Sequence, residues 1–449
     1  MHLKLSEELA YLNLGDSRRK DRFERIIQQQ VSNPGISIMA AGYSWSDIKM
    51  TYRFYSNDSV DQGAISACIQ KATVDRCIRN SVVLSVQDTT SINFSSSAEG
   101  LGYLDHGMGE GLMLHNTLVL DESGCPLGLL DQQIWARDKA EMGKRKTRHQ
   151  RPIEEKESYR WIQSMQHVST MLKEHPKVVH IADREADIYE LFTAPRPAGA
   201  ELLIRCTHDR KTLWGNDMWQ EIAAEKPLAT FSLSLSKASS EQSEEVMMEV
   251  KASMVLMAPP VHKGSLPSLT MYGLMVRQIN SAESPALEWK LVSTLPITNR
   301  EEAIRAIRWY SYRWRIERFH YILKSGCRLE DLQLRSVKAL KKAVVIYSLS
   351  AFKLMQLLYQ SRQQPDQSCE HYLDEQEWKL LLSIHSKSPV IQAKPPTLQQ
   401  SIILIGRLGG YLARSNDGPP GIKNLWRGLQ KLNIMLNAIN LNKQWFSTK

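Results

Sequence analysis

One segment, Thr298 to Gly326, most constrains what this chain can fold into, because it joins a strong helical pattern to polar residues on one face. Glu301 follows Thr298 by three residues, which predicts a capping box, and the segment ends at a glycine. At about 100° per residue, four polar side chains share a stripe about 60° wide: Tyr310, Arg313, Glu317 and Lys324. The other faces are apolar and predict a buried helix; they carry Ile304, Ile307, Trp314, Ile316, Phe319, Ile322 and Leu323.

The polar stripe has two interpretations on the helix alone. Glu317 and Arg313 are one turn apart and satisfy the spacing of a structural ion pair. Alternatively, Glu317 is a metal ligand, while Tyr310, Arg313 and Lys324 hold a phosphate. The remainder of the chain decides between them.

Two further acidic residues follow apolar, β-branched runs that predict buried strands. Asp88 comes just after Val82–Val86, and Asp183 ends the run 177–183. Strands at Leu112–Leu120, Pro126–Trp135 and 201–205, and a helix at 154–175, complete the order β-β-β-α-β-α-β. This order describes a ribonuclease-H-like α/β core, in which the first and fourth strands are neighbours. We therefore expect Asp88 and Asp183 to meet, with Glu317 as the third acid.

The regions around this core define the expected domains. Residues 1–65 predict a helical DNA-binding domain, and residues 66–360 a catalytic domain with a β-rich insertion at about 207–296. Residues 361–449 predict a helical C-terminal domain for dimerisation, although its apolar helix faces also suit an internal core. In the N-terminal domain, a cationic run is either a solvated face or a DNA contact: Arg18, Arg19, Lys20 and Arg22.

The overall charge suits a nucleic-acid partner. The formal net charge is +9, and a basic loop at 139–151 is a candidate clamp on a DNA backbone. Six scattered cysteines without a CxxC pattern argue against a zinc site and for a reducing cytoplasm. No apolar run approaches the roughly 20 residues of a membrane span. We expect a cytoplasmic protein that acts on DNA, without a membrane partner.

Three converging carboxylates need cations, since each pair 4 Å apart costs about 4 kcal/mol at an effective dielectric constant near 20. A ligand set made only of oxygen selects Mg²⁺, with Mn²⁺ as a substitute. Two such ions about 4 Å apart support in-line displacement at a phosphodiester. The ion-pair interpretation leaves Asp88 and Asp183 unexplained. The sequence thus predicts metal-dependent nucleotidyl transfer.

The same residues resemble a known family. The segment WYSYRWRIERFHYILKSG is similar to the Y-(2)-R-(3)-E-(6)-K signature of bacterial cut-and-paste DDE transposases of insertion-sequence family four, the group that includes the transposon-five transposase. SVQDTTS and ADREADI resemble the two aspartate motifs of that family. LGDSRRKDR and TYRFYSNDSV resemble its end-binding domain, EEKES its core and RLGGYLARS its dimerisation domain.

The resemblance implies a catalytic triad of Asp88, Asp183 and Glu317 and a homodimer that pairs two terminal inverted repeats of double-stranded DNA. It implies excision through a hairpin and joining of the 3′-hydroxyl to target DNA, in a bacterial, nucleoid-associated setting. Trp289 matches a tryptophan that stacks on a flipped base, with a core aromatic as the alternative. Arg205 and Arg210 match arginines near the cut strand, whereas Thr207 replaces a family lysine.

Two other functions remain open from the sequence. One is a ribonuclease-H-like nuclease or recombinase that cuts without strand transfer. The other is a silent DNA-binding repressor of transposition, which has no need of three acids.

Overall fold

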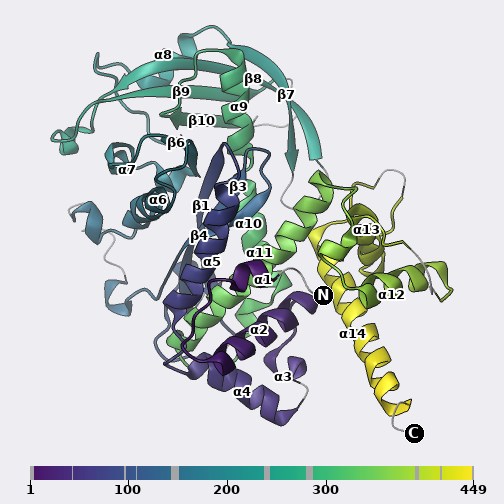
Figure 1. The fold of residues 1–449 in the computed structure, drawn as a ribbon. Coiled ribbons are helices and arrows are strands. Elements are labelled where there is room, and N and C mark those ends of the chain that lie inside the picture. Colours follow the sequence, from purple (N-terminus) through teal and green to yellow (C-terminus); the bar gives the residue numbers. More distant parts are fainter. Residues whose placement is uncertain are drawn as a thin grey trace.

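One twisted sheet runs through the middle and top of the molecule as drawn in Figure 1, and helices pack around it. The computed structural model describes residues 5–42, 44–95, 98–107, 109–142, 151–236, 243–279, 287–389, 394–414 and 417–446. Within these residues the strand order is β2-β3-β1-β5-β6-β10-β9-β8-β7, and β4 pairs with β3. The strands are β1 (Val83–Asn93), β2 (Gly102–Tyr103), β3 (Glu110–Asp121), β4 (Pro126–Trp135), β5 (Val178–Ala182), β6 (Ala200–Arg205), β7 (Ala229–Ser236), β8 (Ser243–Met257), β9 (Leu269–Gln278) and β10 (Glu288–Ser293).

The centre of the sheet has the predicted topology. β1 pairs antiparallel with β3 and parallel with β5, and β5 pairs parallel with β6. Every residue of β5 is buried, as expected of a strand covered on both faces. The first strand is therefore a direct neighbour of the strand that precedes Asp183.

The β-rich insertion is a continuation of this sheet. β10 pairs antiparallel with β6, and β9, β8 and β7 follow outward in turn. These long strands curve across the top of Figure 1, where α8 (Met218–Ala224) lies against them. β8 is the longest of these strands, and its early residues pair with β7. The insertion and the core thus share one hydrogen-bonded scaffold.

A long buried helix, α11 (Val337–Gln363), links the sheet to the N-terminal region. It packs against β4 and against helices of the first 77 residues, which lie at the bottom of Figure 1. The N-terminal region contains α1 (Leu5–Leu9), α2 (Ser17–Ser32), α3 (Ile38–Ala41), α4 (Trp45–Ser56) and α5 (Gln62–Cys77), of which α2, α4 and α5 contact α11. On the sheet lie α6 (Tyr159–Met171) and α7 (Tyr189–Thr193), and α6 starts later than the predicted residue 154.

The segment predicted as one helix is broken into three pieces. These are α9 (Arg300–Ser311), α10 (Trp314–Tyr321) and a π-helix at Ile322–Gly326. The capping box predicted at Thr298 and Glu301 is wrong by one residue, since the Asn299 side chain accepts from the backbone N–H of Glu302 at 3.0 Å. Trp314 is 42% exposed, so the apolar surface of the segment is not wholly buried.

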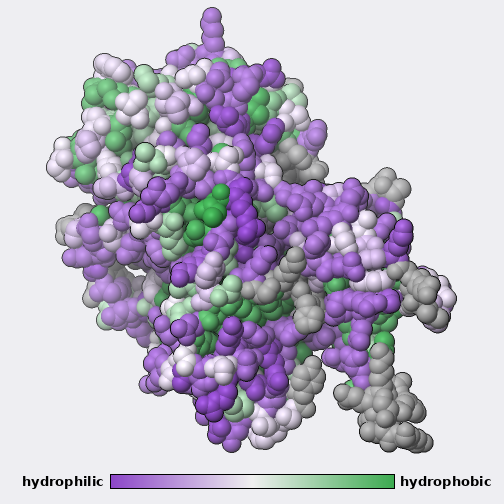
Figure 2. Space-filling model, viewed as in Figure 1, coloured by the Kyte–Doolittle hydropathy of each residue, from purple (hydrophilic) through white to green (hydrophobic). Residues whose placement is uncertain are grey.

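The C-terminal region is helical, as predicted, and is built from α12 (Glu375–Ser386), α13 (Leu398–Leu408) and α14 (Ile422–Phe446). The first half of α14 buries Leu425, Trp426, Leu429 and Leu432. Its second half leaves the body of the molecule and exposes Ile434, Met435, Ile439 and Leu441, and hydrophobic atoms lie over it in Figure 2. One half of α14 therefore belongs to the internal core, and the other half presents an exposed apolar face. In the described part of the chain, no helix has the length and apolar character to cross a membrane.

A buried ion cluster fastens α1 to the core. Glu8 is fully buried, and its carboxylate accepts from Arg76 of α5 at 2.7 Å and from Lys353 of α11 at 3.3 Å. Burial lowers the pKa of Lys353, and the neighbouring Glu8 opposes that change. Arg76 and Lys353 therefore both depend on the buried Glu8 carboxylate as their counter-charge.

We expect Glu8→Gln to destabilise the protein by about 3–5 kcal/mol, because it leaves Arg76 and Lys353 buried without a counter-charge. The free energy of unfolding from urea titration, followed by circular dichroism, measures this loss. Glu7→Gln is the matched control, since Glu7 is exposed on the same helix. Equal unfolding midpoints for the two variants would contradict the assignment.

Candidate active site

Strand register brings Asp88 and Asp183 together. β1 and β5 pair from Val83 opposite Val178 to Val86 opposite Ile181, a constant offset along the chain. Extending this register by two residues sets Asp88 level with Asp183, which directly follows β5. Asp88 lies in the middle of β1, level with the residue at which β5 has just ended, and its side chain is 16% exposed.

Asp183 is held by the turn that it starts. Its side chain caps the short 3-10 helix Arg184–Ala186 by accepting from the backbone N–H of Glu185 at 2.9 Å. Burial raises the pKa of Asp183, and the nearby Asp88 raises it further, while Arg313 and Arg160 oppose the shift. The two aspartates therefore lie close enough to repel each other.

Glu317 faces the same two aspartates from α10. Burial raises the pKa of Glu317, and so do Asp88 and Asp183, whereas Arg313 lowers it. The Arg313 guanidinium donates to Glu317 at 2.6 Å, which is the predicted ion pair. Among the described residues, no three His, Cys, Asp or Glu side chains are grouped closely enough to hold a metal ion. The three acids thus influence one another's pKa without forming a metal-sized group, and Glu317 is paired with Arg313.

The donor set fits a hard divalent ion. All three groups are carboxylates, and the pKa values of Asp183 and Glu317 are raised first by burial and then by neighbouring carboxylates. A bound cation favours the charged form of such groups, and oxygen ligands are those that Mg²⁺ and Mn²⁺ prefer.

Tyr310 and Lys324 lie on either side of this triad. The Tyr310 hydroxyl is buried without a hydrogen-bond partner, and burial raises its pKa against the opposing effects of Arg313 and Arg205. Burial lowers the pKa of Lys324, with Glu330 and Asp88 opposing the change. Lys324 belongs to the π-helix, a form often found at functional sites. All four residues of the predicted stripe thus border the two aspartates.

Trp289 lies behind the stripe rather than at the surface. Its ring is 3% exposed and packs edge-on against Tyr310, with 5.2 Å between ring centroids. The core-aromatic alternative therefore describes Trp289 here. Arg205 is half-buried at the end of β6, where it donates to the backbone carbonyl of Glu288 at 3.1 Å.

Arg210 is placed differently from its predicted DNA contact. Its side chain is 7% exposed and forms a 2.5 Å ion pair with the fully buried side chain of Asp187. Asp187 also accepts from the backbone N–H groups of Thr207 and His208. In the DNA-free protein the Arg210 guanidinium is therefore engaged inside the protein by Asp187, at the loop after β6.

The predicted N-terminal cations divide into exposed and engaged groups. Arg18 is 89% exposed at its side chain and pairs with Asp16, the residue that caps α2. Arg19 donates to the backbone carbonyl of Leu14, and Arg22 forms an ion pair with Asp47. Lys20 is half-buried. Arg18 is the freest of the four to meet a phosphate.

Arg160 and Glu185 border the site and were not predicted. Arg160 of α6 donates to Thr89, next to Asp88, at 2.8 Å and to Glu185, two residues after Asp183, at 2.6 Å. It thus ties the two aspartate segments together from outside the sheet. Glu185 belongs to the ADREADI motif, which was a usable signal, but nothing local to Arg160 marks it.

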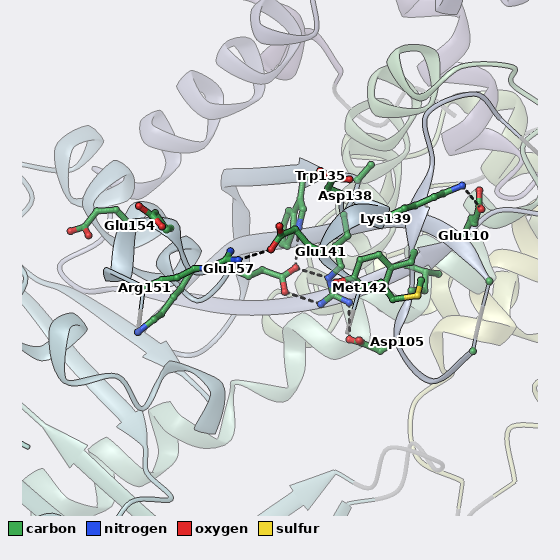
Figure 3. Close-up of a pocket in the computed structure, with 18 residues that line it drawn as sticks. Asp105, Glu110, Trp135, Asp138, Lys139, Glu141, Met142, Arg151, Glu154 and Glu157 are labelled. Carbon is green, nitrogen blue, oxygen red and sulfur yellow. Dashed lines mark hydrogen bonds and ion pairs between the residues drawn. The ribbon is translucent and has the colours of Figure 1, made fainter. Parts of the chain in front are cut away.

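A separate hollow of about 930 Å³ lies at the base of the basic loop and contains none of the triad (Figure 3). Arg137 joins Glu157 at 2.8 Å and Asp105 at 2.7 Å across it, and Arg151 joins Glu141 at 2.8 Å. Of the predicted clamp at 139–151, residues 143–150 lie outside the described residues. The flanks of the loop are therefore fixed by ion pairs.

Family models match three successive parts of the chain. The transposase DNA-binding model matches residues 3–60, the transposase DDE domain model residues 127–352, and the transposase Tn5 dimerisation domain model residues 349–448. The second match includes Asp183 and Glu317 and begins after Asp88. Among solved structures, the chain is similar to a piggyBac transposase in a cryo-EM synaptic complex with hairpin DNA. That similarity has 8% identity and a TM-score of 0.39, over 78% of this chain and 67% of that chain.

We expect Asp183→Asn to stabilise the metal-free protein at neutral pH, with a melting temperature higher by about 1–3 °C. Because burial and Asp88 raise the pKa of Asp183, its ionised form opposes folding at every pH above that raised value. The gain should vanish as the pH falls below the ordinary aspartate pKa, where the carboxyl is protonated in both folded and unfolded states. Thermal unfolding of both proteins between pH 3 and 8 in EDTA tests this. A variant less stable at pH 7 would contradict the repulsion.

Proposed function

The chain belongs to the DDE transposases, whose domain model covers residues 127–352, and from this premise we propose that it moves an insertion sequence by cutting and pasting. It is a metal-dependent enzyme that cuts DNA and transfers strands, and it binds DNA and forms homodimers. The finer steps are our proposal. The protein binds the terminal inverted repeats, pairs two ends in a dimer, excises the element through a hairpin and joins its 3′-hydroxyl ends to target DNA.

The observation that carries this proposal is the convergence of Asp88, Asp183 and Glu317 from β1, β5 and α10. We assign these three carboxylates to two Mg²⁺ ions, with Mn²⁺ as a substitute. When bound, such ions activate the attacking oxygen and stabilise the leaving oxygen of a phosphodiester. The protein contributes the fixed placement of the two aspartates and the cations around the site.

Arg313 links DNA binding to this ligand set. Its guanidinium is occupied by Glu317 in the DNA-free protein, and a phosphate is the partner that its planar donors fit equally well. A DNA phosphate that takes over Arg313 releases the Glu317 carboxylate toward Asp88 and Asp183. Metal binding is then favoured only where a DNA strand lies in the site.

The neighbouring donors hold the strand. The unpaired Tyr310 hydroxyl and the Lys324 ammonium group bind phosphate oxygens beside the reacting one. Arg205 contributes positive charge at the end of β6. A stacking contact between Trp289 and a DNA base requires its ring to leave Tyr310. Arg210 supports the loop after β6 through Asp187.

The three regions divide these tasks. The N-terminal helices bind the ends through Arg18 and the cations near it, and the exposed half of α14 is the dimer contact. The boundary expected at residue 65 falls inside α5, so we place the end of the first region in the loop before it. The one expected at residue 360 falls inside α11. We place the enzyme at chromosomal DNA in the bacterial cytoplasm.

We expect Asp88→Asn, Asp183→Asn and Glu317→Gln each to reduce cleavage of a terminal-repeat duplex in Mg²⁺ by at least about a thousandfold. Each removes a charged ligand at nearly constant volume. Binding to the same duplex should remain, because the end contacts lie in the N-terminal region. A gel assay with labelled DNA measures both. Glu122→Gln, at an exposed turn, is the control, and continued cleavage by any triad variant would refute the assignment.

We expect Arg313→Gln to bind Mn²⁺ about tenfold more tightly than the unchanged protein in the absence of DNA, because it removes a positive charge beside Glu317. Free Mn²⁺ in a titration followed by electron paramagnetic resonance measures the affinity. DNA cleavage should fall in the same variant, since the phosphate loses a donor. Arg308→Gln, on the exposed side of α9, should change neither property. Unchanged Mn²⁺ affinity in Arg313→Gln would rule out the exchange.

A further inference from the structure

A buried histidine touches Asp88, and the proposed reaction gives it no task. His320 follows Glu317 by one helical turn and is 6% exposed. Its Nδ1 atom lies 3.5 Å from Oδ2 of Asp88. The opposite ring nitrogen, Nε2, lies 3.0 Å from the side-chain amide nitrogen of Asn116.

The hydrogen bonds on the far side of Asn116 show which group donates in the contact between Asn116 and His320. The Gln132 amide nitrogen donates to the Asn116 side-chain oxygen at 2.8 Å and to the Ser348 hydroxyl at 2.9 Å. Because the Asn116 oxygen accepts from Gln132, the amide nitrogen of Asn116 is the group that faces His320. An amide nitrogen only donates, so Nε2 of His320 accepts.

This arrangement fixes the tautomer of the ring. A neutral imidazole with Nε2 as an acceptor carries its proton on Nδ1. With the proton on Nδ1, the group that lies 3.5 Å from the Asp88 oxygen is an N–H, at the outer limit of a hydrogen bond, whereas a lone pair on the same nitrogen would repel the carboxylate. A series of side-chain contacts therefore reaches one oxygen of Asp88, a candidate metal ligand. It runs through Ser348, Gln132, Asn116 and His320.

The supporting residues are fixed independently of the metal. Asn116 is opposite Asp88 in the pairing of β3 with β1, and it is fully buried. Ser348 is fully buried in α11, and His320 packs on Phe319 at 5.8 Å between ring centroids. Ligating carboxylates are commonly oriented by such a second hydrogen-bonding partner, whose loss weakens metal binding.

We propose that His320 is a positioning residue for Asp88: its Nδ1–H, fixed by Asn116 on Nε2, restrains one carboxylate oxygen and leaves the other for the divalent ion. This inference rests on the proposed metal site. It adds a requirement for metal binding beyond the three acids themselves: the Asp88 carboxylate needs a fixed orientation as well as a charge. The same network connects β3, α10 and α11 at a single ring.

The first test measures the affinity of the full-length protein for Mn²⁺. The protein is bound to a terminal-repeat duplex whose reacting phosphate has been made uncleavable. We expect His320→Leu to weaken Mn²⁺ binding about 10–100-fold. His320→Asn should lose less, because its amide nitrogen can replace the Nδ1 donor. His371→Asn, at an exposed histidine, should bind as the unchanged protein does. Equal Mn²⁺ affinity in all four proteins would overturn the proposal.

The second test reads the tautomer and needs no metal. In ¹⁵N-histidine-labelled protein, the His320 signals, assigned by their loss in His320→Asn, should be those of a ring protonated on Nδ1. Asn116→Asp, which keeps the side-chain volume, should move a proton to Nε2 because it puts an acceptor there. A ring protonated on Nε2 alone in the unchanged protein would overturn the inference. Failure of the proposed function would give a different result from failure of this inference. The unchanged protein would then bind no Mn²⁺, or the Asp88→Asn variant would bind Mn²⁺ as tightly as the unchanged protein does.

Discussion

The parallel pairing of β1 with β5 is the constraint on which the rest of this molecule depends. Its register sets Asp88 level with Asp183, and a slip of one residue would turn either carboxylate to the opposite face of the sheet. The register is held by apolar contacts, since Val83, Leu84 and Val86 are fully buried and β5 is buried throughout. Hydrophobic packing therefore keeps two like charges together that repel each other.

The charges around those carboxylates are compensated from several elements. Arg160 reaches them from α6, Arg313 from the turn before α10, and Lys324 from the π-helix. Each cation is at least partly buried, so each interaction is stronger than it would be in water. The protein thus holds an electrostatic balance before any ion or DNA arrives, and a phosphate or a divalent ion displaces part of it.

Local patterns in the sequence were sufficient to predict an element where its buried residues also follow the regular spacing of that element. The strands before Asp88 and Asp183 were predicted because runs of β-branched residues identify a buried strand without knowledge of its neighbours. The break at Tyr312 and Arg313 was not predicted, since neither residue disfavours a helix strongly. The positions of Trp289 and Arg210 depend on Tyr310 and Asp187, which are distant in sequence. No local pattern encodes such pairs. The joining of the insertion to the core by β10 and β6 was missed for the same reason.

The turn after Lys324 brings all three matched regions into contact. A Cβ atom on Gly326 would lie 2.7 Å from the Trp426 ring of α14, and one on Gly35 would lie 2.7 Å from the Gly326 carbonyl oxygen. The Gln430 side chain of α14 donates to the carbonyl of Pro34, which closes the contact between the two outer regions. Packed interiors resist local displacement, so backbone at this turn cannot shift without moving both neighbours. The position of Lys324 therefore depends on packing by the DNA-binding and dimerisation regions as well as on the helix that carries it.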